Sequence, residues 1–225
     1  AGGGRIAEMV PEGLEFDPEI GRYFLTDEPP RPRDPRPWSS SARAEEKAAS
    51  AAADPRMGDV RRALRFFGKD GDASPRSGAV ADVCCGDAFL ARRFADSGKF
   101  ESVFALDVDW ACLESARSLA EQEGLGPAQG LRLLRADAQA LPFRDGALDF
   151  AWWGMGLHKV DDADFALRGL FAALRPGGGR LLATTVAPRF SPRMLQDMAE
   201  EVGFSRVYAE QPGGGRAVAL EAVRP

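Results

Sequence analysis

From residue 79 to the end of the chain, segments that favour β-strands alternate with segments that favour helices. Strand-forming residues fill 79–84, 102–107, 131–135, 148–153, 180–185, 204–208 and 217–222. Apolar residues recur at helical spacing in four of the connecting segments, 89–97, 110–123, 163–174 and 191–202. Strands joined by such helices pair in parallel through right-handed crossovers, with helices on both faces. The alternation therefore predicts an α/β fold with a doubly wound sheet.

The last two predicted strands break this alternation. Only a short segment separates them, and it contains the turn residues Pro212, Gly213, Gly214 and Gly215. Strands joined by so short a turn pair antiparallel. The expected architecture is thus a Rossmann-like, seven-stranded, mostly parallel sheet with an antiparallel C-terminal edge strand.

Residues 1–56 differ from the rest, because proline, glycine and polar alanine-rich stretches interrupt their hydrophobic pattern. Within them we expect a β-hairpin on either side of 17–21, where Pro18 and Gly21 suit a turn. Residues 29–38 are rich in proline and arginine and favour polyproline II, either as a docking surface or as a solvated linker. Residues 41–53 favour a surface helix. We therefore divide the chain into an N-terminal extension, 1–56, and a domain, 57–225, whose first helix runs from about 59 to 67.

Charge and cysteine content narrow the function classes. The net charge of −5 and the pI near 5.1 give no global basic field, so we expect no nucleic-acid partner. Cys84, Cys85 and Cys112 make no even disulfide framework, and the adjacent pair lacks metal-ligand spacing. Free thiols in a reducing compartment and no metal site are the expectation.

The chain shows no sign of a membrane anchor. No apolar run approaches the roughly 18 residues that a transmembrane helix needs, and no apolar signal core stands at the start. We expect a soluble protein of the cytoplasm or of an organelle interior. The first residue is Ala1, which fits a removed targeting peptide and a trimmed sequence equally well.

In a doubly wound sheet, ligands bind beyond the carboxyl ends of the strands. The first such loop lies in residues 80–90, VADVCCGDAFL. It resembles the first motif of class I S-adenosylmethionine-dependent methyltransferases, in which an acid, here Asp82, precedes three alternate glycines. Only Gly86 is kept, since Cys84 and Ala88 hold the other two positions. In that family the loop lets the backbone approach the methionine part of the cofactor, so we expect the Cys84 side chain to weaken binding. Taken alone, the segment also suits an ordinary strand-to-helix turn.

The second loop begins at Asp107, which ends a strand about twenty residues after the glycine loop. An acid at this place can accept hydrogen bonds from both ribose hydroxyls of the cofactor. Helix capping is the alternative role, but Asp109 is better placed to cap the helix that starts near residue 110. The resemblance adds Val108 to the site and makes Cys112 a neighbour of the adenine.

The third loop, residues 135–150, is the segment most similar to the family. The resemblance implies that Asp137 meets the adenine amine and that the Ala138 amide meets a ring nitrogen. Residues 152–158 then wall the methyl-transfer site, with at most one of Trp152 and Trp153 facing it because strand neighbours alternate. A turn at 174–182 also matches the family, so the likeness runs from about residue 79 to the end.

These motifs define the predicted site. Cofactor binding is assigned to Asp82, Cys84, Gly86, Ala88, Asp107, Val108, Asp137, Ala138 and Trp153. His158, the single histidine, suits a general base, although packing at the start of a loop explains it equally well. Many methyl transfers need no base, because positioning lowers much of the barrier.

The function expected from the resemblance is S-adenosylmethionine-dependent methylation of a small molecule. The alternative is a methyltransferase-like subunit without turnover, docked on a protein assembly through its N-terminal extension. A nicotinamide dehydrogenase would keep the loop glycines. A methyltransferase acting on amino groups of nucleobases or glutamine would carry an asparagine-proline-proline-aromatic motif, which is missing here.

Overall fold

The computed structural model describes residues 14–17, 22–25, 54, 56–69, 76–212 and 215–225. The predicted hairpin turn, the segment 29–38 and the surface helix 41–53 lie outside these residues. From residue 79 onward the predicted alternation is confirmed, with boundaries that differ by one or two residues. Its elements are β3 (Ala79–Val83), α4 (Phe89–Asp96), β4 (Ser102–Asp107), α5 (Trp110–Gln122), β5 (Leu131–Arg135), β6 (Phe150–Gly154), α6 (Ala163–Ala173), β7 (Arg180–Val186), α7 (Pro192–Val202), β8 (Ser205–Glu210) and β9 (Ala217–Val223).

Seven of these strands form the predicted sheet, in the order β5-β4-β3-β6-β7-β9-β8. Strands β3 to β7 pair in parallel. Strand β9 pairs antiparallel with both β7 and β8, so it inserts between them and leaves β8 at the edge. The strand order reverses between β3 and β6. At such a reversal the two crossover connections leave on opposite faces and open a crevice at the carboxyl ends of the strands.

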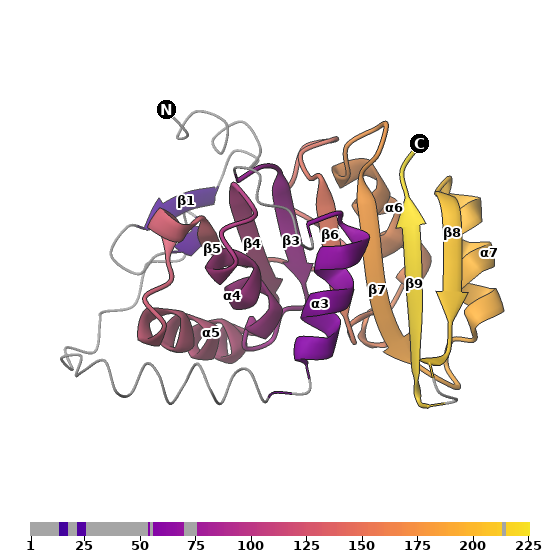
Figure 1. Ribbon diagram of the computed structural model, residues 1–225, viewed down its shortest axis with the longest axis horizontal. Helices are drawn as coiled ribbons and strands as arrows, with labels where there is room; N and C mark the ends of the chain where they lie inside the picture. Colours follow the sequence, from indigo (N-terminus) through magenta and orange to yellow (C-terminus); the bar gives the residue numbers. More distant parts are fainter. Residues whose placement is uncertain (1–13, 18–21, 26–53, 55, 70–75, 213–214) are drawn as a thin grey trace.

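The predicted N-terminal hairpin is also part of this sheet. Strands β1 (Leu14–Asp17) and β2 (Arg22–Leu25) pair antiparallel, and β2 pairs in parallel with β5. The hairpin extends the sheet to nine strands and continues it beyond β5 (Figure 1). Part of the predicted extension is therefore joined to the domain through backbone hydrogen bonds.

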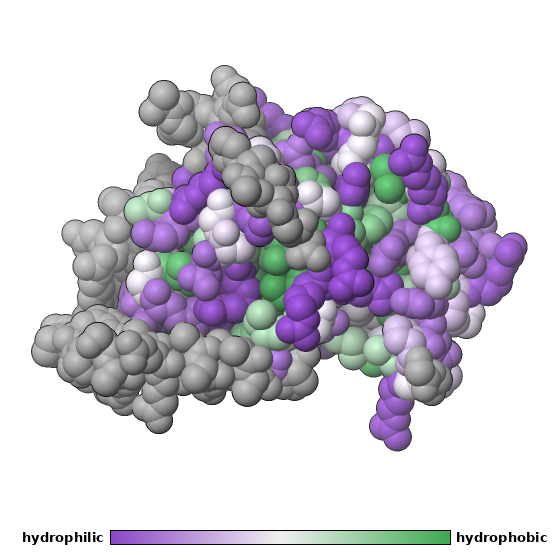
Figure 2. Space-filling model, viewed as in Figure 1, coloured by the Kyte–Doolittle hydropathy of each residue, from purple (hydrophilic) through white to green (hydrophobic). Residues whose placement is uncertain are grey.

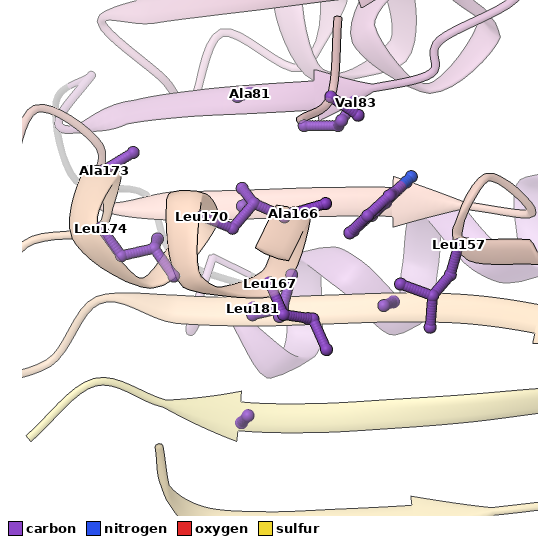
Figure 3. Close-up of a cluster of buried hydrophobic side chains, with 14 of the residues drawn as sticks. Ala81, Val83, Leu157, Ala166, Leu167, Leu170, Ala173, Leu174 and Leu181 are labelled. Carbon is purple, nitrogen blue, oxygen red and sulfur yellow. The ribbon is translucent and has the colours of Figure 1, made fainter. Parts of the chain in front are cut away.

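Helices cover both faces of the sheet (Figure 1). Helix α3 (Met57–Phe66) lies with α4 and α5 on one face, where Val60, Phe94 and Leu113 belong to one buried cluster. Helices α6 and α7 cover the other face. There Leu167 and Leu170 pack on the strands in a second cluster (Figure 3). The apolar residues that set the helical spacing are thus the residues that fix each helix on the sheet.

The described surface is mixed in polarity. On the side seen in Figure 2, hydrophobic residues form small separate areas among hydrophilic ones. None of the described helices is long and apolar enough to cross a bilayer.

Candidate cofactor-binding site

The loop after β3 keeps the backbone of a glycine loop although two glycines are missing. Cys84, Gly86 and Ala88 have φ values of 57°, 56° and 54°, so all three alternate positions are left-handed. This conformation costs a residue with a Cβ roughly 1–2 kcal/mol. A Cβ added at Gly86 would meet nothing within 4 Å, which shows open space beside the loop. The loop therefore leaves its backbone accessible at Gly86.

Asp107 joins this loop to the end of β4. Its Oδ2 accepts a hydrogen bond from the Gly86 amide at 2.8 Å, and its Oδ1 accepts one from the Asp109 amide at 2.9 Å. A carboxylate offers about four lone-pair sites, so acceptor capacity remains for further hydroxyl groups. Asp109 caps α5 by accepting from the Ala111 amide, as its position predicted. The capping role is thus filled by Asp109 and leaves Asp107 available for a ligand.

The third predicted loop is tied to its surroundings through its side chains. The exposed Asp137 accepts a hydrogen bond from the Gln139 amide at 2.8 Å. Gln139 in turn accepts from the Asp162 amide at 2.7 Å, which joins this loop to the start of α6. Among the described residues, the Ala138 amide has no hydrogen-bond acceptor. An amide without a protein partner suits a ligand acceptor such as a ring nitrogen.

The segment most similar to the family stabilises the fold as well as lining the site. Phe143 packs on Phe104 of β4, with ring centroids 5.2 Å apart. Gly146 has a φ of 73° and makes the turn toward β6. Asp149 accepts a hydrogen bond from the Ala79 amide at 2.8 Å and pairs with Arg175 at 2.7 Å. This carboxylate holds the beginnings of β3 and β6 together.

Cys84 is partly buried and packs against the hydrophobic core. A Cβ added at Gly156 would lie 2.8 Å from the Cys84 Cβ and would overlap the Trp153 indole nitrogen. The Trp153 N–H faces the Cys84 thiol, a weak acceptor, and has no other acceptor within the described residues. Burial raises the pKa of Cys84 to about 11, so the thiol stays protonated at neutral pH. The expected weakening of cofactor binding by this side chain stays a prediction.

The two neighbouring tryptophans lie on opposite faces of the sheet, as alternation predicted. Trp152 packs in the cluster beneath α3 and α4, and Trp153 packs in the cluster beneath α6. Both are buried, and Trp153 is 0% exposed. Trp153 therefore supports the site from behind Cys84 and Gly156.

Asp82 and Ala88 are also buried beneath the loop. Asp82 accepts a hydrogen bond from the Ala91 amide at 3.0 Å and so fixes the first turn of α4. Burial, helped by the charges of Asp87 and Asp107, raises the pKa of Asp82 to about 7. Asp82 and Ala88 thus shape the loop after β3 from inside. Gly86, Asp107 and Asp137 lie on the accessible side of the loops after β3, β4 and β5.

His158 lies beyond the end of β6, in a short 3-10 turn (Leu157–Lys159). Its Nδ1 is 3.3 Å from the hydroxyl of Thr185 on β7. Partial burial lowers the pKa of His158, and the charges of Lys159 and Arg189 lower it further. The imidazole is therefore neutral at pH 7 and can accept a proton.

Two exposed apolar side chains follow the carboxyl ends of β4 and β6. Val108, which the sequence placed in the site, is 62% exposed beside Asp107. Met155 is 40% exposed at the end of β6, and its φ of 52° is left-handed. Met155 falls within the predicted wall 152–158, and the glycines on either side of it signal a strained turn. Thr185 was not predicted, because a hydroxyl within a strand pattern carries no distinctive signal.

The accessible atoms fit the cofactor that the resemblance implies. They comprise an open glycine and carboxylates with free acceptor capacity at Asp107 and Asp137. The buried Ala138 adds an amide that has no partner among the described residues. These groups gather at the carboxyl ends of β3, β4 and β5, next to the reversal of strand order. Fold and site together define the class I S-adenosylmethionine-dependent methyltransferase architecture.

Comparison with known proteins leads to the same class. Residues 80–178 match a family model described as a methyltransferase domain. An uncharacterised chloroplastic methyltransferase of Arabidopsis thaliana is 31% identical over 116 residues, which are 51% of this chain and 32% of that protein. The ubiquinone/menaquinone biosynthesis C-methyltransferase UbiE of Cronobacter sakazakii is 30% identical over 137 residues, 59% of this chain and 53% of the relative. The chain thus spans between a third and about half of the length of these relatives.

A solved structure supports the fold. The [4+2]-cyclase SpnF superimposes with a TM-score of 0.63 at 19% identity, covering 78% of this chain and 85% of that one. The resemblance to class I S-adenosylmethionine-dependent methyltransferases is confirmed over residues 80–178, which match the methyltransferase domain, and the solved structure supports the fold. S-adenosylmethionine is the cofactor of this class, as in the solved phosphoethanolamine N-methyltransferase 2 of Haemonchus contortus in complex with S-adenosyl-L-methionine, which shares the fold.

Proposed function

We propose that this chain binds S-adenosylmethionine at the loops after β3, β4 and β5 and transfers its methyl group to a small molecule. The left-handed backbone at Cys84, Gly86 and Ala88 carries this proposal. A loop that had lost its ligand would be under no constraint to keep a conformation that two of its residues disfavour. Its retention favours a loop that still binds.

The described residues divide the work of binding among them. Gly86 lets the backbone approach the methionine part, and Asp107 accepts hydrogen bonds from the ribose hydroxyls. Asp137 and the Ala138 amide meet the adenine edge. Val108 offers an exposed apolar surface beside the ring. When bound, the cofactor supplies an activated methyl group on a sulfonium centre.

Acceptor chemistry takes place near Met155 and His158 in this proposal. With a proton on Nδ1 donated to Thr185, the Nε2 of the neutral imidazole is free to accept a proton from a hydroxyl, thiol or activated carbon. Names of relatives such as UbiE indicate small-molecule acceptors. The substrate therefore belongs to the small molecules, entering over Met155.

Isothermal titration with S-adenosylmethionine and S-adenosylhomocysteine tests the proposal directly. We expect both ligands to bind with micromolar affinity. Absence of heat at high micromolar ligand would contradict it and would favour a methyltransferase-like subunit without turnover. In that second role, residues 1–56 would dock the chain on a protein assembly.

Residues 57–225 form the catalytic domain in this proposal, and 1–56 an added segment. Strand β2 of the added segment pairs with β5 of the domain, so the two parts are in contact. For location, the chloroplastic relative favours an organelle interior over the cytoplasm. Fusion of the full-length gene product to a fluorescent protein tests this assignment.

A further inference from the structure

Arg56 joins the segment before α3 to the loop that follows β3. Its Nη1 donates a hydrogen bond to the Oδ1 of Asp87 at 2.8 Å. Its Nε and Nη2 donate to the carboxylate of Asp54 at 3.0 and 2.8 Å. The guanidinium carbon also lies 4.1 Å from the centre of the Phe89 ring. Two carboxylates and an aromatic face thus fix the position of one guanidinium.

Asp87 lies between two left-handed residues of the loop, Gly86 and Ala88. Its Oδ1 accepts from the Phe89 amide at 3.2 Å, and its carbonyl accepts from Arg92 Nε at 3.3 Å. Asp87 therefore connects the loop to the first turn of α4 and, through Arg56, to the segment before α3.

The loop needs such support because two of its left-handed residues carry a Cβ. Strained backbone persists only where the surroundings determine it. Asp107 holds the loop from the side of β4, through the Gly86 amide. Asp87 is the corresponding anchor on the other side, and Arg56 is the cation that fixes its carboxylate from outside the loop.

We infer that Arg56 is a positioning residue, which holds the cofactor loop in its left-handed conformation through Asp87 and the Phe89 ring. The inference rests on the proposed function in one respect, namely that this loop binds the cofactor. It gives a role to the junction between the predicted extension and the domain. The residues before α3 would then tune cofactor affinity without touching the cofactor.

Hydrogen–deuterium exchange of the full chain without ligand tests the positioning role. The amides of Gly86, Ala88, Phe89, Ala91 and Arg92 all donate hydrogen bonds in the structure, so their exchange reports opening of the loop. We expect Arg56→Met and Asp87→Asn each to accelerate exchange within 85–92 about two- to fivefold. Exchange in the double variant should be little faster than in either single variant, because both single variants remove the same Arg56–Asp87 ion pair.

Arg193→Met is the matched control. It removes an exposed arginine–aspartate pair on α7, where Arg193 Nη2 lies 2.9 Å from Asp197. Exchange within 85–92 should stay unchanged in this variant. Arg56→Lys keeps the charge and should recover part of the protection.

Titration with S-adenosylmethionine completes the test. The dissociation constant for S-adenosylmethionine should rise about two- to fivefold in Arg56→Met and stay unchanged in Arg193→Met. Unaltered exchange within 85–92, acceleration spread evenly over the chain, or additive effects in the double variant would each overturn the inference. A wild-type chain that binds no cofactor would refute the proposed function instead, and the exchange experiment would still decide the role of Arg56.

Discussion

The Gly86 amide and the Asp107 carboxylate are joined by a hydrogen bond of 2.8 Å, which links the loops after two neighbouring parallel strands. The acid proposed to bind the ribose and the glycine of the proposed cofactor loop are thereby held in one arrangement before any ligand arrives. Because less ordering is then needed on binding, such preorganisation favours affinity.

Replacing this carboxylate should weaken cofactor binding. In Asp107→Ala, the ribose hydroxyls and the Gly86 amide lose a charged acceptor, so we expect a loss of about 1–3 kcal/mol in binding free energy. Calorimetric titration with S-adenosylhomocysteine measures it. Asp145→Ala removes an exposed acid from the loop that leads to the amino end of β6 and serves as the control. Equal affinities for Asp107→Ala and the wild type would remove the ribose assignment.

The sequence predicted the sheet correctly because the apolar pattern that builds a parallel sheet is local and periodic. The same holds for Asp109, whose capping role follows from its place before α5. The packing of Cys84 could not be predicted from the sequence, because it depends on the space that Trp153 and Gly156 leave at the end of another strand. Arg56 was missed for a similar reason. Its partner Asp87 lies 31 residues away, and no spacing rule connects the two.

Gly156 should be intolerant of any side chain. A Cβ there would overlap the Trp153 indole nitrogen and lie 2.8 Å from the Cys84 Cβ, so Gly156→Ala should destabilise the fold by about 1–3 kcal/mol through overpacking. Thermal unfolding measures the change. Gly169→Ala on α6 is the control, and it should stabilise the fold rather than destabilise it. A Cβ at Gly169 meets nothing within 4 Å, and alanine favours a helix by about 0.5–1 kcal/mol. A neutral Gly156→Ala would show that the packing around Trp153 is looser than the structure indicates.

Asp82 should make stability depend on pH. Burial raises its pKa from 3.8 to about 7, so the folded chain favours the protonated acid. The stabilising effect of this proton is complete below about pH 4 and is lost as pH rises toward 7. Asp82→Asn keeps an acceptor for the Ala91 amide without the buried charge. Its unfolding free energy should exceed that of the wild type by on the order of 2–4 kcal/mol at pH 8, and the advantage should shrink toward pH 4.

Denaturant unfolding of Asp82→Asn and the wild type at pH 4.5, 6 and 8 measures this difference. Because all other titrating groups are shared, the difference between the two proteins isolates Asp82. An advantage that is constant across the three pH values would show that Asp82 is ionised in the fold throughout this range.

His158 should set the acid limb of activity if it accepts the substrate proton. Partial burial and the charges of Lys159 and Arg189 lower its pKa below 6.5, and a base works only when unprotonated. With an acceptor that must lose a proton, kcat/KM should therefore rise with pH through a midpoint below 6.5 and be level near pH 7.5. His158→Gln should abolish this rise of kcat/KM with pH and lower kcat about 10²- to 10⁴-fold, while cofactor affinity stays unchanged.

A matched Thr185→Val, which removes the hydroxyl beside the His158 Nδ1, should lower kcat less and shift the midpoint of the pH profile. If His158→Gln keeps both the wild-type rate and the same acid limb, His158 is a packing residue and the transfer proceeds by positioning alone.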